Sequence, residues 1–315
     1  MEQSRRRFLS TVTRGGLAGV AAAGSWGQRR TVAAELDAFH PRFAICNETF
    51  RDWPFEKAFA FAAECGYTGV EIAPFTVEND VTQISAARRK TIRKQTDAAG
   101  LEVVGLHWLL SRTKGLHLTS PDQATRRRTA KYLAELGRFC ADLGGDLLVF
   151  GSPKQRNLAP GVSLQQGMTY ATEVIQEALP QLEKSGVRLA LEPLSSRITN
   201  FLSTAGETSQ LVKKVGSDRC QMILDCNAMQ TESKSREALI REHHRSLVHF
   251  HANDPNGQGP GFGDLDFVPL LTALRDVKFS GWISVEVFNY KPGPERLARE
   301  SIAYLKKCLP KTAQR

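Results

Sequence analysis

The segment GVRLALEPL, residues 186–194, contains a short apolar run that ends in a carboxylate and a proline. An apolar run of this length, bounded by glycine and proline, is typical of a buried strand. Burying a charged carboxylate is unfavourable unless an opposite charge compensates for it. Glu192, at the end of this run, therefore needs either a cation beside it or water above it.

Seven other segments share this strand-like pattern. They cover residues 42–50, 68–75, 101–110, 146–153, 220–229, 247–254 and 281–289. Helical patterns separate them, and several of these end in glycine directly before the next strand, as helix C-termini often do. Eight strands that alternate with helices are what a (β/α)8 TIM barrel of the α/β class requires.

An open doubly wound sheet is the competing architecture. Such a sheet usually carries a glycine-rich phosphate loop after its first strand, and CNETFRDWPF (46–55) is not one. Because no linker or change of composition interrupts the series, we expect a single barrel domain over residues 35–315.

Residues 1–34 do not continue this pattern. They contain SRRRFL (4–9) and then the weakly apolar GGLAGVAAAG (15–24), an order that resembles a twin-arginine export signal with Arg5 and Arg6 as its arginine pair. This resemblance implies export by the Tat translocon to the periplasm or another extracytoplasmic space, with cleavage after Ala34. A disordered basic arm that binds nucleic acid or a membrane surface is the alternative.

Charge and apolar content limit the partners. The chain has 42 basic and 33 acidic residues, and the leader holds six arginines and one glutamate, so 36 and 32 remain after residue 34. This nearly balanced remainder argues against a nucleic-acid partner. No apolar run reaches the roughly 20 residues of a membrane span. The six cysteines stand singly, so the sequence predicts no particular disulfide, and it leaves the oligomeric state open.

Four consecutive strand-like runs end in side chains that bind metals. They are Glu192 in LEPL, Asp225 in ILDCN, His251 in HFHAND and Glu286 in SVEVF. Barrel enzymes carry their chemistry at the C-terminal ends of the strands. One such carboxylate alone would equally well be a helix cap or an ion-pair partner. Three carboxylates and an imidazole together suit one divalent ion, namely Mn²⁺, Mg²⁺, Co²⁺ or Zn²⁺.

These motifs, together with HFHANDPNGQGPGFGDLDF (249–267) and GWISVEVF (281–288), resemble the sugar isomerase/epimerase superfamily over residues 40–310. This superfamily has a xylose isomerase-like barrel and includes ketose 3-epimerases, hydroxypyruvate isomerases and family 2 AP endonucleases. The resemblance implies that the four residues hold one divalent metal, and that Glu192 and Glu286 also move the protons of a sugar substrate.

The residues themselves suggest the same chemistry. A metal that chelates a carbonyl and a neighbouring hydroxyl acidifies the intervening C–H and stabilises the ene-diolate. Two carboxylates could then remove a proton and return one, which gives isomerisation or epimerisation. With a leaving group next to the carbanion, the same site would act as a 3-keto-glycoside lyase or an inosose dehydratase. Export favours free sugars, keto-sugars or oxidised glycosides over sugar phosphates.

The chain departs from the ketose epimerases at three positions. Those enzymes carry a sugar-contacting Glu, His and Arg where this chain has Ile198, Ala228 and Gly257. The metal ligands are therefore retained, whereas the residues that recognise the substrate differ.

Other polar residues near strand ends are candidates for substrate binding. His107 is also a catalytic candidate, because it offers a base or a donor to a hydroxyl, and Trp108 offers a stacking face. A buried histidine that donates to a backbone carbonyl is the alternative for His107. Glu71, at the end of the second strand, is a further substrate-binding candidate.

Two loops supply the remaining candidates. Lys154 and Arg156 follow the fourth strand and would hold a carboxylate, a phosphate or a second sugar, or else belong to a solvated loop. Asp254 is a substrate-binding candidate next to His251. Its alternative role, together with Asn253, is to orient the imidazole and shape the loop.

Two other classes of function remain as alternatives. A DNA repair endonuclease shares the barrel, but Ala228 removes one histidine that its zinc cluster needs, and GPGFGDLDF (259–267) lacks a D-x-H motif. A sugar-binding barrel without catalysis is the second alternative, and the presence of all four metal-type ligands argues against it.

Overall fold

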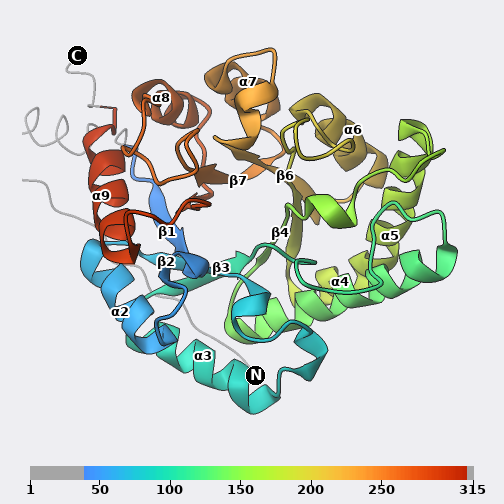
Figure 1. The fold of residues 1–315 in the computed structure, drawn as a ribbon, viewed down its shortest axis with the longest axis horizontal. Helices are drawn as coiled ribbons and strands as arrows, with labels where there is room; N and C mark the ends of the chain where they lie inside the picture. Colours follow the sequence, from blue (N-terminus) through green and yellow to red (C-terminus); the bar gives the residue numbers. More distant parts are fainter. Residues whose placement is uncertain (1–38, 311–315) are drawn as a thin grey trace, which may run out of the picture. The chain divides into compact units, whose positions relative to one another are not determined.

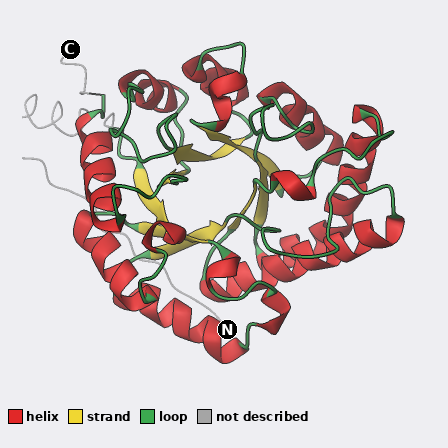
Figure 2. Ribbon diagram, viewed as in Figure 1, coloured by secondary structure: helices red, strands yellow, loops and turns green. Residues whose placement is uncertain are grey.

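Short apolar strands and amphipathic helices alternate through residues 39–310, the part of the chain that the computed structural model describes. The strands pair in parallel in chain order, and the last pairs with the first through Arg42 and Trp282, which closes a barrel (Figure 2). The strands are β1 (Arg42–Cys46), β2 (Gly69–Ile72), β3 (Glu102–Leu106), β4 (Leu147–Phe150), β5 (Arg188–Leu191), β6 (Cys220–Asp225), β7 (Leu247–Ala252) and β8 (Trp282–Val285). The predicted (β/α)8 TIM barrel is confirmed.

A ring of helices surrounds these strands (Figure 1). The helices are α2 (Phe55–Cys65), α3 (Ala86–Ala98), α4 (Gln123–Leu143), α5 (Leu164–Ser185), α6 (Ala205–Val215), α7 (Arg236–His243), α8 (Val268–Asp276) and α9 (Pro294–Lys307). Left-handed glycines end α2, α4, α5 and α6, as the sequence pattern indicated. None of the helices described is long and apolar enough to cross a membrane.

Strand residues alternate between two apolar clusters. On β4, Leu148 and Phe150 belong to the large cluster between strands and helices, whereas Leu147 and Val149 belong to a smaller one with Ala190, Ile223 and Trp282. Because neighbouring side chains on a strand point to opposite faces, the smaller cluster fills the barrel interior.

The same alternation positions polar side chains at the ends of the strands. Glu192 comes two residues after Ala190, just beyond the end of β5. Asp225 comes two residues after Ile223, at the end of β6. Each therefore points to the interior, just past the apolar layer. The residues predicted to act together consequently lie at one end of the barrel.

The first strand is shorter than its sequence pattern suggested. β1 ends at Cys46, and Asn47–Phe50 form the 3-10 helix η1. The side-chain oxygen of Asn47 accepts a hydrogen bond of 2.8 Å from the backbone N–H of Ala73, which fixes this turn beside the end of β2. Polar residues of the segment 47–49 thus enter the barrel mouth instead of extending the sheet.

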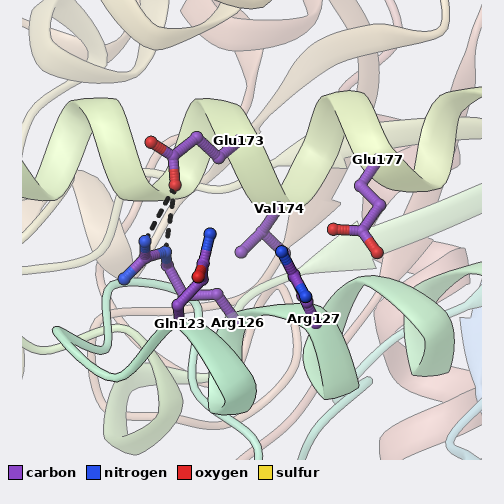
Figure 3. A pocket seen from close by; sticks show the side chains of 6 residues that line it. All are labelled: Gln123, Arg126, Arg127, Glu173, Val174 and Glu177. Carbon is purple, nitrogen blue, oxygen red and sulfur yellow. Dashed lines mark hydrogen bonds and ion pairs between the residues drawn. The ribbon is translucent and has the colours of Figure 1, made fainter.

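A surface hollow lies between α4 and α5, on the outer ring of helices (Figure 3). It is lined by residues of these two helices, and one pair of opposite charges meets there, with Arg126 Nη2 3.0 Å from Glu173 Oε2. The hollow is therefore distinct from the group of residues at the strand ends. The six cysteines all lie within the described range and are unpaired. Arg5 and Arg6 of the predicted export signal lie outside that range.

Candidate metal centre

Four side chains from consecutive strands converge at the barrel mouth. Glu192 follows β5, Asp225 ends β6, His251 lies near the end of β7 and Glu286 follows β8. Each offers one ligand atom, and these atoms all lie within 4.8 Å of one another. All four residues are at most 5% exposed. The structure therefore brings together the four residues that the sequence predicted as metal ligands.

The charges in this group are unbalanced. Burial and the negative charge of Glu286 raise the pKa of Asp225 to about 6. Burial, followed by the charges of Glu286 and Asp225, raises the pKa of Glu192 well above its usual range. Against the effect of burial, Glu286 and Glu71 raise the pKa of His251. Additional positive charge would therefore stabilise the group.

The geometry of His251 also fits a cation. Its Nδ1 atom lies 2.9 Å from Glu286 Oε2 and 4.0 Å from Asp225 Oδ2, yet it makes no hydrogen bond. The nitrogen and the carboxylate oxygens face a common region without being aligned as donor and acceptor. Carboxylate oxygens and one imidazole nitrogen are donors that Mn²⁺, Co²⁺ and Zn²⁺ accept, so the residues fit a divalent ion.

Glu71 positions His251. Its two oxygens lie 3.2 and 3.3 Å from His251 Nε2, and Oε2 lies 2.9 Å from His249 Nε2. An Nε2–H that donates to this carboxylate leaves Nδ1 as the atom that faces Asp225 and Glu286. Glu71 is fully buried, so we revise its expected role from substrate binding to positioning. His249 was not foreseen, although its spacing of two from His251 in HFH places both on one face of β7.

Asp225 is held on both oxygens. The amide of Asn253 donates to Oδ2 at 2.5 Å, and the backbone N–H of Ala228 donates to Oδ1 at 2.6 Å. We had expected Asn253 to orient the imidazole of His251. Its amide instead orients Asp225. Asp254 is 1% exposed and accepts a hydrogen bond from the backbone N–H of Gly263. It thus shapes its loop, which is the alternative role predicted for it.

Arg156 also differs from its predicted role. It is fully buried, and its guanidinium donates to the backbone carbonyls of Glu192 at 2.6 Å and Phe150 at 2.8 Å. These bonds hold the ends of β4 and β5 together and engage the guanidinium with the backbone. A Cβ at Gly151 would overlap the Glu192 carboxylate, so glycine leaves the room that this side chain needs. Lys154 is exposed in η4 (Pro153–Gln155) and remains a substrate-binding candidate.

Two residues after β3 border the same group. The indole N–H of Trp108 donates to Glu286 Oε1 at 2.8 Å, which fixes the orientation of that carboxylate. His107 Nε2 lies 2.7 Å from Glu48 Oε2, and both side chains are buried. Burial opposes protonation of His107, but Glu48 raises its pKa to about 9. Glu48 was missed because it lies in a segment that the sequence pattern assigned to a strand.

Comparison with known proteins agrees with this geometry. The xylose isomerase-like TIM barrel family matches residues 59–308. The D-psicose 3-epimerase of Agrobacterium fabrum is 27% identical over 72% of this chain and 76% of its own length. The 3-dehydro-D-guloside 4-epimerase of Escherichia coli is 24% identical over 83% of this chain and 98% of its own length.

A solved structure shows the same fold. The D-psicose 3-epimerase from Clostridium cellulolyticum H10, in its structure with D-tagatose, superposes with a TM-score of 0.75. It is 19% identical in sequence and covers 85% of this chain and 99% of its own.

Stabilisation by a metal should increase with pH. The pKa of Asp225 is raised in the folded state, so its ionisation lowers the stability of the metal-free protein as pH rises from about 4 to about 6. Metal binding needs the ionised form and is therefore favoured above that range. We expect Mn²⁺ to raise the melting temperature more at pH 7.5 than at pH 5. Asp225→Asn should lose most of this increase, whereas the exposed control Asp218→Asn should keep it. An equal increase at both pH values would contradict the assignment.

The positioning role of Glu71 predicts a loss of metal affinity. Glu71→Gln should weaken Mn²⁺ binding about 10- to 100-fold, because the amide lacks the negative charge and the second acceptor oxygen that hold the Nε2–H of His251. Isothermal titration calorimetry measures this change, and Glu102→Gln, at the exposed start of β3, is the control. Affinity equal to that of the unaltered protein would show that Glu71 does not position the ligand.

Proposed function

The chain belongs to the xylose isomerase-like TIM barrel family, and we propose that it is a divalent-metal-dependent epimerase of a sugar or keto-sugar. The observation that carries this proposal is the convergence of Glu192, Asp225, His251 and Glu286 within 4.8 Å. The similarity to enzymes named as ketose 3-epimerases and a glycoside 4-epimerase supports the reaction class.

These four residues would hold the ion. When bound, a divalent ion acidifies the C–H next to a chelated carbonyl and stabilises the resulting ene-diolate. The chain's own task is then to remove a proton from one face of the substrate and to return it on the other. We assign this task to Glu192 and Glu286, which follow β5 and β8, two strands that are not neighbours in the barrel.

The two glutamates have different surroundings. Glu192 has a pKa raised by burial and by the neighbouring carboxylates, so its ionised form is the stronger base. Burial also raises the pKa of Glu286, but the neighbouring His251 has the larger opposite effect, so the pKa of Glu286 is lowered. Trp108 also fixes one Glu286 oxygen. We therefore assign proton removal in one direction to Glu192. Glu286, which its lowered pKa keeps ionised, takes up a proton from solvent before it returns one to the opposite face of the substrate.

A lyase acting on a 3-keto-glycoside is the second candidate. Elimination needs a proton donor for the departing oxygen, and His107 is held protonated by Glu48 with a pKa of about 9. The named substrate of the Escherichia coli relative, a 3-dehydro-guloside, is also a keto-glycoside. His107 thus remains a catalytic candidate under either reaction.

Deuterium exchange tests the proposed proton transfers. The Mn²⁺-loaded protein in D₂O should incorporate deuterium next to the carbonyl of a ketose or a 3-keto-glycoside, detected by NMR. Glu192→Gln and Glu286→Gln should each slow exchange about 10²- to 10⁴-fold at saturating Mn²⁺. The exposed control Glu177→Gln should not.

The product then distinguishes the reactions, because an epimer indicates the epimerase and a released aglycone indicates the lyase. Absence of exchange on every ketose and keto-glycoside tested, with metal content verified, would contradict both.

We also propose that residues 1–34 are a twin-arginine leader that directs the enzyme to substrates outside the cytoplasm. Changing Arg5 and Arg6 together to lysine should retain the protein in the cytoplasmic fraction of a bacterial host with a Tat system. The unaltered chain should appear outside the cytoplasm in shortened form. Equal distribution of the two proteins would contradict export by this route.

A further inference from the structure

Three aromatic side chains form a row beside the candidate metal centre. Phe75 follows β2, Trp108 follows β3 and Phe288 follows β8. The ring centroid of Trp108 lies 6.1 Å from that of Phe75 and 6.2 Å from that of Phe288. The indole N–H of Trp108, the middle ring, donates to Glu286, so the row contacts the centre at its midpoint.

The row extends to solvent at both ends. Phe288 is 41% exposed, although a phenylalanine of a folded domain is usually buried. At the other end, the exposed guanidinium of Arg112 lies 4.3 Å from the ring centroid of Phe75. A flat group that enters from solvent would therefore meet aromatic faces and one cationic plane before it reached Glu286.

Exposed apolar groups gather at this end of the barrel. Within the described residues, four large apolar side chains are substantially exposed, and two of them, Ile198 and Phe288, follow the strands that carry Glu192 and Glu286. Ile198 is 56% exposed. An apolar binding partner would cover such residues without leaving buried polar groups unpaired.

The backbone that presents the row is strained. Trp108 and Arg112 have φ angles of 54° and 65°, in the left-handed region that residues other than glycine rarely adopt. Such strain persists where the surrounding structure imposes it, often at binding sites. Here it holds the two ends of the segment 108–112 at the mouth.

We propose that Phe75, Trp108, Phe288 and Arg112 form a subsite for the aromatic aglycone of a glycoside substrate whose sugar lies at the metal centre. This inference rests on the proposed function and narrows its substrate class. An aromatic ring is preferred over a second sugar because it can join a succession of rings that already pack edge-to-face (79°) and tilted (49°) against one another, with the Arg112 guanidinium over the outer ring. The three rings themselves offer no free hydrogen-bonding group for sugar hydroxyls, because their one donor, the indole N–H, already donates to Glu286.

Binding of unreactive glucosides tests the subsite. The probes are phenyl β-D-glucopyranoside, methyl β-D-glucopyranoside and cellobiose, titrated into the Mn²⁺-loaded protein with Trp fluorescence and calorimetry as readouts. We expect the phenyl glucoside to bind about tenfold more tightly than the other two. Phe288→Ala should reduce this preference about three- to tenfold, the effect of one lost aromatic contact.

Two variants control for indirect effects. Phe288→Tyr keeps the ring and should keep the preference. Leu164→Ala removes a side chain of similar exposure, 40%, at the start of α5 and should also keep it. Equal affinity for the phenyl and methyl glucosides, or a preference that survives Phe288→Ala, would overturn the subsite. Cellobiose binding as tightly as the phenyl glucoside would also overturn it, in favour of a second sugar.

The experiments distinguish a failure of the aglycone subsite from a failure of the proposed function. A protein that exchanges deuterium into a free ketose but shows no preference for the phenyl glucoside retains its function and loses the subsite. A protein that binds the phenyl glucoside but exchanges no proton on any substrate retains the subsite and loses the epimerase function.

Discussion

The structure depends on one electrostatic constraint, which is that three carboxylates and an imidazole are buried within 4.8 Å of one another at the mouth of the barrel. Burial adds to the cost of the carboxylate charges in this group, and the carboxylates repel one another. Both effects raise the pKa values of Glu192 and Asp225. The group is maintained because each of the four residues lies at or just beyond the end of a strand and the barrel closes around them. A divalent cation would turn this unfavourable arrangement into a binding site.

Surrounding side chains limit the freedom of each ligand. Glu71 fixes His251, Asn253 fixes Asp225 and Trp108 fixes Glu286, each through hydrogen bonds to the ligand's own side chain. Arg156 acts on Glu192 differently, because it bonds the backbone carbonyl and leaves the carboxylate free. This difference agrees with the assignment of Glu192 as the residue that takes a proton from substrate.

The sequence was sufficient for the barrel and for the convergence of the four candidate ligands, because strand periodicity determines which side chains face inward and where each strand ends. It was not sufficient for the partners of those ligands. Glu71 and His249 meet across the barrel interior, and no local pattern specifies which inward residues touch. Arg156 donates to the backbone carbonyls of Glu192 and Phe150. The sequence of a loop does not show which groups a long side chain in it will contact. Glu48 enters the site because η1 replaces the expected end of β1.

The central claim is that one divalent ion binds between Glu192, Asp225, His251 and Glu286. The most direct measurement is an anomalous difference map from crystals of the protein grown with Mn²⁺. The account predicts one strong peak, about 2.0–2.4 Å from a carboxylate oxygen of each acidic ligand and from Nδ1 of His251. No peak at full Mn²⁺ loading, or a peak coordinated by Nε2 of His251, would contradict it.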